Sequence, residues 1–190
     1  MTQIRRQTRR AFFGLSMAAA VAGFASAALA ADALNIGAYP TNPPFETKLT
    51  TGAFEGFEVD IVTEAAKRAG MTTNIADYGF QALFAAVASK RIDVAISTIT
   101  ITAERLKSVS FTQPYYDSDM GIATKVESAI KSIPDLKGKT VGYLSGSTGE
   151  KWVTDNKGPS GFGDVKGYKA QTDLLLDLNA GRVEDRKSVV

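Results

Sequence analysis

Residues 74–96, NIADYGFQALFAAVASKRIDVAI, contain a helix pattern between two strand patterns. We predict strands at Asn74–Tyr78 and Ile92–Ile96. Between them, apolar side chains recur at the spacing of one helix face, at Phe80, Leu83, Phe84, Val87 and Ala88. A strand, a helix and a strand in this order predict an α/β fold with a mainly parallel sheet.

The alternation of strands and helices extends towards the N-terminus. Leu34–Ala38 is predicted to be a strand, and the prolines that follow it indicate an extended loop. From Gly56 onwards the apolar spacing is helical again, and Gly70 ends that helix. We expect this first α/β unit to cover residues 31–124.

A second unit with the same alternation is expected over residues 125–184. The pattern predicts strands at Lys139–Leu144 and Val165–Tyr168, and helices around Glu150–Thr154 and Thr172–Leu178. A loop rich in Gly is predicted at Lys157–Gly163. Because the next strand is only begun, we expect this second unit to be partial.

The first 30 residues have the pattern of a secretory signal peptide. Four arginines precede a small, apolar segment that ends in Ala28-Leu29-Ala30, so we expect cleavage after Ala30. The apolar segment is short and rich in Ala and Gly, which disfavours the alternative of a membrane anchor. Arg9-Arg10 followed by Phe12-Phe13 resembles a twin-arginine signal, and both this route and the general secretion route stay open.

The absence of Cys and His excludes several kinds of chemistry. The chain has no disulfide framework, no thiol nucleophile, no Ser-His-Asp triad and no His-ligated zinc site. We predict no catalytic residue, no metal and no cofactor. Removal of the signal peptide takes four of the 22 basic residues and no acidic residue, which leaves a net charge of −2. Without a basic stripe, no nucleic-acid partner is expected, and we expect a monomer.

A segment rich in hydroxyl groups, Ser97–Arg105, follows the carboxyl end of a predicted strand, where open α/β sheets bind ligands. Thr98, Thr100 and Thr102 alternate with isoleucines, so we expect their hydroxyls on one side of an extended segment. Thr102 is expected to cap a short helix whose first turn holds Arg105. A guanidinium there opposes the helix dipole and can bind a carboxylate through two hydrogen bonds. A solvated arginine beside ordinary strand hydroxyls is the alternative.

Two further features are consistent with a ligand site. The turn Ser145–Gly149 precedes a helix, and N–H groups at a helix N-terminus favour an anion, although the turn lacks the lysine of a nucleotide-binding P-loop. A simple capped turn is the alternative. Phe80 opens a helix at a strand end, where it either covers an apolar ligand face or belongs to the core. By contrast, Glu58, Asp60 and Glu64 are expected on a solvated outer face.

The mature chain resembles family 3 of the extracellular solute-binding proteins, the amino-acid receptors of ABC importers. The resemblance runs from Leu34 to Glu184, and Gly56–Ile61 fits the family signature throughout. Further blocks follow in family order and spacing at Asn42–Glu46, Lys90–Val94, Thr100–Arg105, Phe111–Tyr116, Asp135–Lys139 and Gly146–Glu150.

The resemblance implies a two-lobed clamshell of the type II periplasmic binding protein class, with its second lobe incomplete. It also implies a periplasmic protein that closes on one free amino acid and delivers it to a membrane permease. The implied ligand-binding residues are Arg105, Ser147 and Thr148 for the α-carboxylate, and Ser97, Thr98 and Thr100 for the α-carboxylate and α-ammonium groups. Phe80 would cover the ligand side chain, and Leu144 would contribute a backbone contact. Many members carry an aromatic residue where this chain has Asn42, so the stacking partner is absent or supplied by Tyr39.

Two other functions are compatible with this fold. One is a periplasmic dehydratase of prephenate or arogenate, which would need an acid near the substrate ring. Glu46 and Glu55 are candidates, but the sequence places both in loops. The other is the sensor domain of a receptor, which would need a membrane helix downstream.

The C-terminal residues Asp185–Val190 depart from the family pattern. Family members continue with a hydrophobic strand and an aspartate for the ligand ammonium, which by spacing would fall at Val189. Because residues 185–187 are polar, we predict that they do not form a buried parallel strand. The peptide DRKSVV is a translation of GATCGGAAGAGCGTCGTG, which resembles a sequencing adapter. We therefore expect a truncated frame with a non-native tail, unpaired strand edges, poor folding and impaired binding; a natural divergent terminus is the alternative.

Overall fold

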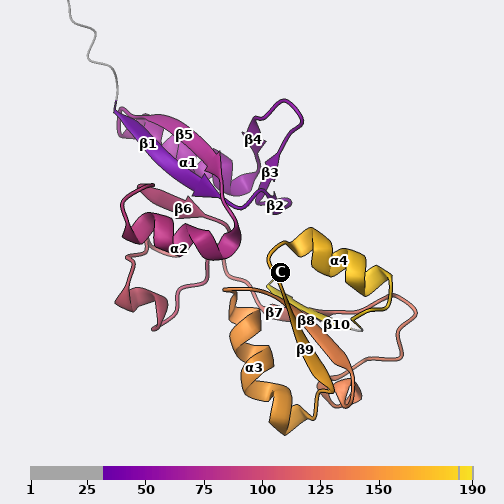
Figure 1. Ribbon diagram of the computed structural model, residues 1–190. Helices are drawn as coiled ribbons and strands as arrows, with labels where there is room; N and C mark the ends of the chain where they lie inside the picture. Colours follow the sequence, from indigo (N-terminus) through magenta and orange to yellow (C-terminus); the bar gives the residue numbers. More distant parts are fainter. Residues whose placement is uncertain (1–31, 184, 190) are drawn as a thin grey trace, which may run out of the picture. The chain divides into compact units, whose positions relative to one another are not determined.

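The computed structural model describes residues 32–183 and 185–189, and the predicted signal peptide lies outside these residues (Figure 1). The first sheet contains β1 (Ala33–Ala38), β5 (Thr72–Asp77) and β6 (Val94–Ile96), in the order β5-β1-β6. All its pairings are parallel, and helices α1 (Phe57–Arg68) and α2 (Phe80–Ala88) connect the strands. The strand–helix–strand prediction for residues 74–96 is therefore confirmed.

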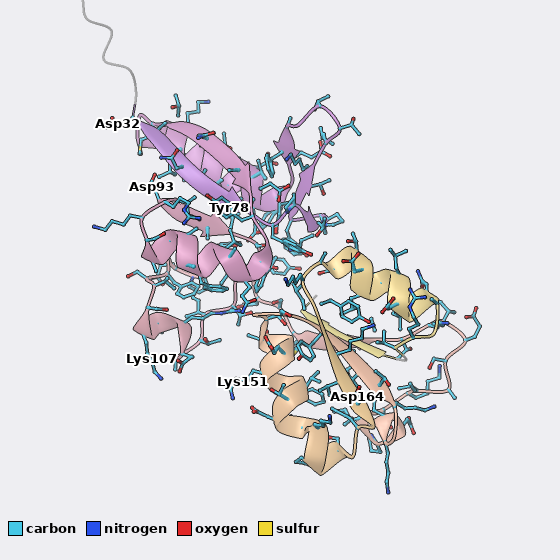
Figure 2. The ribbon with its side chains drawn as sticks, in the orientation of Figure 1. Asp32, Tyr78, Asp93, Lys107, Lys151 and Asp164 are labelled. Carbon is cyan, nitrogen blue, oxygen red and sulfur yellow. The ribbon has the colours of Figure 1, made fainter. Side chains whose placement is uncertain are left out.

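Alternate residues of β1 face the two helices. Ile36 and Ala38 pack with Val59 and Val62 of α1. Gly37 faces α2, because a Cβ atom there would lie 2.8 Å from the Cδ2 atom of Leu83. The two-residue period of a strand thus explains why the helices cover opposite faces of the sheet. Asp93, labelled in Figure 2, accepts a hydrogen bond from the Asn35 N–H at 2.9 Å and ties the start of β6 to β1.

The proline-rich segment after β1 is more ordered than the predicted loop. It forms a small antiparallel sheet of β2 (Thr41–Asn42), β3 (Glu46–Lys48) and β4 (Phe54–Glu55). Glu46 begins β3 and is fully buried, and Glu55 ends β4, so the predicted place of both residues in loops is wrong. The strands are only two or three residues long, which is too short to leave a periodic signal in the sequence.

The second sheet contains β7 (Met120–Ala123), β8 (Thr140–Leu144), β9 (Asp164–Tyr168) and β10 (Asp185–Val189), in the order β7-β10-β8-β9. The predicted boundary after residue 124 leaves β7 in the first unit, whereas β7 pairs with β10 in this sheet. The remaining elements are α3 (Thr148–Ser160), α4 (Gln171–Asn179) and two 3₁₀ turns, η1 (Arg105–Lys107) and η2 (Ile133–Leu136). Both predicted strands and both predicted helices of the second unit are present.

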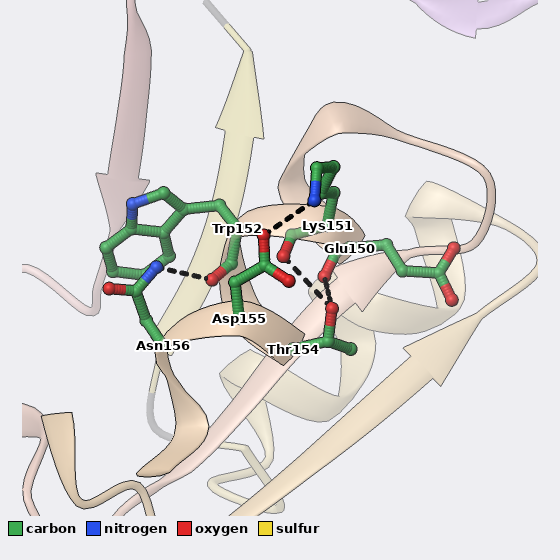
Figure 3. A network of polar contacts seen from close by, with 6 residues as sticks. All are labelled: Glu150, Lys151, Trp152, Thr154, Asp155 and Asn156. Carbon is green, nitrogen blue, oxygen red and sulfur yellow. Dashed lines mark hydrogen bonds and ion pairs between the residues drawn. The ribbon is translucent and has the colours of Figure 1, made fainter. Parts of the chain in front are cut away.

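Helix α3 continues through Ser160, so the loop predicted from Lys157 is wrong over its first four residues. Figure 3 shows side-chain bonds that hold this helix: the Thr154 hydroxyl donates to the carbonyl of Glu150 at 2.9 Å, and Lys151 pairs with Asp155 at 2.8 Å. Beyond the helix end, Phe162 is buried against Val153. This packing outweighs the low helix propensity of Gly and Pro in the last turn.

Residues 185–187, which were predicted not to form a buried parallel strand, do pair as a parallel strand. Asp185–Lys187 pair in parallel with Val141–Tyr143 of β8, and Arg186–Val189 pair in antiparallel orientation with β7. Strand pairing is made by backbone groups, so polar side chains do not prevent it where two strands offer unpaired edges. No helix among the described residues has the length and apolar character needed to cross a membrane.

We predict that the two glycines that flank α1 respond differently to substitution by alanine. Gly56 precedes the helix at φ 131° and ψ 172°, a region that essentially only glycine occupies, and a Cβ atom there would lie 2.3 Å from the Phe45 carbonyl oxygen. Gly56→Ala should lower the free energy of unfolding by about 3 kcal/mol or more.

Gly70 follows the helix at φ 73°, but no atom lies within 4 Å of the corresponding Cβ position. Gly70→Ala should therefore cost only about 1 kcal/mol, and it serves as the matched control. Urea denaturation of both variants measures the difference. Equal losses would show that the contact between Gly56 and the Phe45 carbonyl does not constrain the fold.

Candidate functional site

The carboxyl ends of the first sheet bring several predicted site residues to one edge. Ala38 of β1 lies opposite Asp77 of β5 and Ile96 of β6, so the chain leaves all three strands at this edge. Tyr39 follows β1, and Phe80 opens the helix that follows β5. The segment that begins at Ser97 follows β6. The predicted location of the candidate site at the ends of parallel strands is therefore present in the structure.

Tyr39, which follows β1, contacts both Phe80 of α2 and Gln171 of α4. Its side chain is only 6% exposed, and its ring packs edge-on against Phe80 with centroids 6.2 Å apart. Its hydroxyl accepts a hydrogen bond of 2.6 Å from the N–H of Gln171, the first residue of α4. Phe80 belongs to the same buried cluster, and Leu144 of β8 packs against that cluster. Tyr39 thus joins the edge of the first sheet to α4, a role that the sequence did not indicate.

The hydroxyls of the Ser97–Thr102 segment have different partners. The buried Ser97 hydroxyl donates to Glu46 Oε1 at 2.5 Å, and the Thr98 hydroxyl accepts from the Asn42 amide at 3.0 Å. The Thr102 hydroxyl accepts from the Arg105 N–H at 3.2 Å, as predicted for a cap, but η1 begins at Arg105, so Glu104 rather than Thr102 occupies the cap position. Thr98 has φ 45°, so the backbone turns there and the predicted extended alternation is wrong.

A buried pair of carboxyl groups lies under this segment. Glu58 is 1% exposed, so its predicted place on a solvated face is wrong, whereas Asp60 and Glu64 are exposed as predicted. Both carboxylate oxygens of Glu58 accept from the Thr98 N–H, at 2.9 and 3.0 Å. Glu58 Oε1 also accepts from the Tyr115 hydroxyl.

Burial and the neighbouring Glu58 raise the pKa of Glu46 to about 9. Burial of the Tyr115 hydroxyl, together with its bond to Glu58, raises the pKa of Tyr115 as well. Sequence reasoning missed this cluster because acidic residues at the start of a helix are ordinarily solvated and stabilise the helix dipole. The signal that could have located Glu58 is its position beside Val59, on the apolar side of α1.

Arg105 is held in a preformed position. Its Nη1 atom donates to the Thr100 carbonyl at 2.8 Å, and its Nη2 atom donates to the Gly146 carbonyl at 3.0 Å. The guanidinium carbon lies 4.7 Å from the ring centroid of Phe84 and 5.8 Å from that of Phe80. Burial lowers the pKa of Arg105, but arginine stays cationic at any physiological pH. The structure thus brings Arg105 beside the Ser145–Gly149 turn.

That turn already carries an internal anion. The Gly146 N–H donates to Glu150 Oε2 at 2.6 Å, and the Ser147 hydroxyl accepts from the Glu150 N–H at 3.1 Å. Ser147 also donates its N–H to the Leu144 carbonyl at 3.2 Å, and Thr148 is the first residue of α3. The pairing of Ser147 with Glu150 is a form of capping box, which the S-x-x-E spacing could have indicated. A ligand carboxylate at this turn would meet the Glu150 carboxylate as a competitor.

The described residues hold no group of three or more acidic side chains that could bind a metal ion. The arrangement offers a cation at Arg105, an anion-compatible helix N-terminus at α3, and an aromatic pair, Tyr39 and Phe80. The cation and the aromatic pair are groups that can contact the carboxylate and the side chain of a small ligand.

Comparison with known proteins gives the family. The bacterial extracellular solute-binding proteins, family 3, match residues 34–187. The chain therefore belongs to this family. It is 32% identical over 171 residues to the histidine-binding periplasmic protein of Salmonella typhimurium, and this match covers 90% of the chain and 64% of that relative. The chain thus spans less than two thirds of the length of this relative.

Two further similarities support the fold. The chain is 32% identical over 172 residues to the ABC transporter arginine-binding protein 1 of Escherichia coli, covering 90% of the chain and 68% of that protein. The structure matches that of an ancestral arginine-binding protein bound to arginine with a TM-score of 0.77 and 34% identity, covering 84% of the chain and 71% of the solved chain. The predicted α/β fold of a periplasmic binding protein is thereby confirmed.

We predict that the Tyr39 hydroxyl contributes measurably to stability. Tyr39→Phe keeps the packing on Phe80 but removes the acceptor for the Gln171 N–H, so the free energy of unfolding should fall by about 1 kcal/mol. Tyr78→Phe, at a half-buried neighbouring position, is the control and should cost less than about 0.5 kcal/mol. Denaturant titration compares the two, and an unchanged stability of Tyr39→Phe would contradict the contact.

Proposed function

We propose that the chain is the substrate-binding part of an amino-acid ABC importer and that it binds a free amino acid between two lobes, one for each sheet. The observation that carries this proposal is the position of Arg105. Its planar guanidinium is supported by Phe84, and it donates to Thr100 beside the first sheet and to Gly146 beside the second. A guanidinium held between two segments in this way can exchange a backbone carbonyl for a ligand carboxylate.

In this proposal the ligand α-carboxylate replaces the Gly146 carbonyl at Arg105, displaces the Glu150 carboxylate from the turn, and is joined by donors of Ser147 and Thr148. Thr98 and Thr100 contact the α-carboxylate and α-ammonium groups, and the backbone of Leu144 adds a contact. The Ser97 hydroxyl donates its hydrogen bond to Glu46, so Ser97 supports the loop rather than donating to the ligand. Phe80 and Tyr39 bound the side chain, while Asn42 holds Thr98 rather than stacking on the ligand.

The transport mechanism follows from the division of these groups between two segments. A ligand that contacts both segments stabilises the closed conformation relative to the open one. The size of this effect is the difference between its binding free energies for the two conformations. A membrane permease would recognise the liganded state. The names of the relatives, which include histidine, arginine and cystine, support an amino-acid ligand and a periplasmic location. In this proposal the protein reaches the periplasm by either export route and is cleaved after Ala30.

The dehydratase alternative needs an acid that reaches substrate. Glu46 is fully buried, and its Oε1 atom already accepts from Ser97 and Asn42. Glu55 is exposed at the end of a two-residue strand. Neither position favours an enzyme, so we propose a binding protein.

We predict that replacing Arg105 by lysine weakens amino-acid binding at least tenfold, because lysine keeps the charge but loses the two parallel donors. Isothermal titration of this chain with the twenty L-amino acids and L-cystine identifies the ligand first. Arg68→Lys, at an exposed position paired with Glu64 on α1, is the control and should leave binding unchanged. Absence of binding to a chain that unfolds cooperatively, together with consumption of prephenate, would favour the enzyme.

A further inference from the structure

The two buried acids, Glu46 and Glu58, differ in the hydrogen bonds that they receive. Glu58 accepts the Thr98 N–H through both oxygens and the Tyr115 hydroxyl through Oε1. Glu46 accepts the Ser97 hydroxyl at 2.5 Å and the Asn42 amide at 3.3 Å, both through Oε1. Each acid therefore holds one of the first two residues of the loop that follows β6.

The remaining oxygen of Glu46, Oε2, is buried and accepts no hydrogen bond from any described group. Glu46 and Glu58 are both buried and bind the adjacent residues Ser97 and Thr98, so their carboxyl groups are neighbours. Two ionised carboxylates in this position repel each other, and neither can donate a hydrogen bond. A single proton on Oε2 turns the unpartnered oxygen into a donor and leaves one charge on the pair.

We propose that Glu46 is a positioning residue for the loop Ser97–Thr100 and that it acts as a neutral carboxylic acid, which donates its Oε2 proton to the ionised Glu58. This inference rests on the proposed function only in treating the loop as part of a ligand site. The assignment is asymmetric because three bonds from Thr98 and Tyr115 already stabilise a charge on Glu58. It also explains how Thr98 is kept at φ 45°, an unfavourable conformation for a β-branched residue.

The surroundings of the pair agree with one shared charge. Asn42 of the small sheet, Ser97 and Thr98 after β6, and Tyr115 after η1 are bonded to the pair. None of these four described residues has a cationic side chain. Burial and Glu58 raise the pKa of Glu46 to about 9, and Tyr115 keeps its proton because its own pKa is raised.

The contribution of Glu46 to the free energy of unfolding should decrease as the pH rises. In the unfolded chain Glu46 loses its proton near its ordinary pKa of 4.5, whereas the folded chain retains the proton up to about pH 9. The contribution of Glu46 to stability is therefore fully present below about pH 4.5 and is lost as the pH rises towards 9. A glutamine at position 46 keeps a donor toward Glu58 but cannot titrate.

The test compares the melting temperatures of the wild-type chain, Glu46→Gln and Glu58→Gln between pH 5 and pH 9. Relative to wild type, the melting temperature of Glu46→Gln should rise with pH, by at least about 4 °C across this range. Glu58→Gln places an amide donor against the Thr98 N–H and should lower the melting temperature at every pH. Glu55→Gln, an exposed acid on β4, is the control and should differ from wild type by a constant of about 1 °C or less.

Amide hydrogen exchange at Thr98 measures how firmly the loop Ser97–Thr100 is held. Protection of this N–H should survive in Glu46→Gln within about threefold and fall at least tenfold in Glu58→Gln. A pH-independent difference between Glu46→Gln and wild type, or loss of Thr98 protection in Glu46→Gln, would overturn the proposal. The Glu46→Gln profile decides the matter even if Glu58→Gln does not fold. None of these measurements uses a ligand, so they can succeed or fail independently of the amino-acid titration.

Discussion

The parallel pairing of β1 with β5 on one side and with β6 on the other determines where every candidate group of the first sheet lies. This register ends all three strands at Ala38, Asp77 and Ile96, so Tyr39 and Ser97 leave the sheet side by side. The pairing in turn depends on packing at both faces, with α1 on Ile36 and Ala38 and α2 on Gly37. A change at either face would move the edge that carries the site.

The loop Ser97–Thr100 is held by polar contacts of its first two residues as well as by apolar packing of Ile99. Burial of two carboxyl groups is costly unless their hydrogen bonds are satisfied, and the Glu46–Glu58 pair uses that requirement to hold Ser97 and Thr98. Arg105 is supported from the side by Phe84 and by the Thr100 carbonyl. If the loop and the cation bind a ligand as proposed, these contacts position them in advance, which would reduce the entropic cost of binding.

Much of the fold follows from sequence periodicity, because helices α1 and α2 and the strands β1, β5 and β6 each carry an apolar pattern that matches one face or one buried strand. The sequence also predicted the position of Arg105 at the start of a short helix, where the Thr102 hydroxyl accepts the Arg105 N–H. The extension of α3 to Ser160 could not be predicted, since it depends on tertiary packing of Phe162.

The other failures share one cause. Pairing of the polar strand β10 depends on the free edges of β7 and β8, and burial of Glu46 and Glu58 depends on partners 40 or more residues away, such as Thr98 and Ser97. Local sequence carries little information about such long-range partners. The Tyr39 contact with Gln171 spans 132 residues and is invisible to sequence patterns for the same reason.

We propose that Arg105 exchanges the Gly146 carbonyl for the carboxylate of an amino acid. A crystal structure of this chain with the amino acid identified by titration would show this exchange directly. We expect the ligand carboxylate within about 3 Å of the Arg105 guanidinium and the ligand side chain against Phe80 and Tyr39. An amino acid bound elsewhere, with Arg105 still donating to the Gly146 carbonyl, would contradict this proposal.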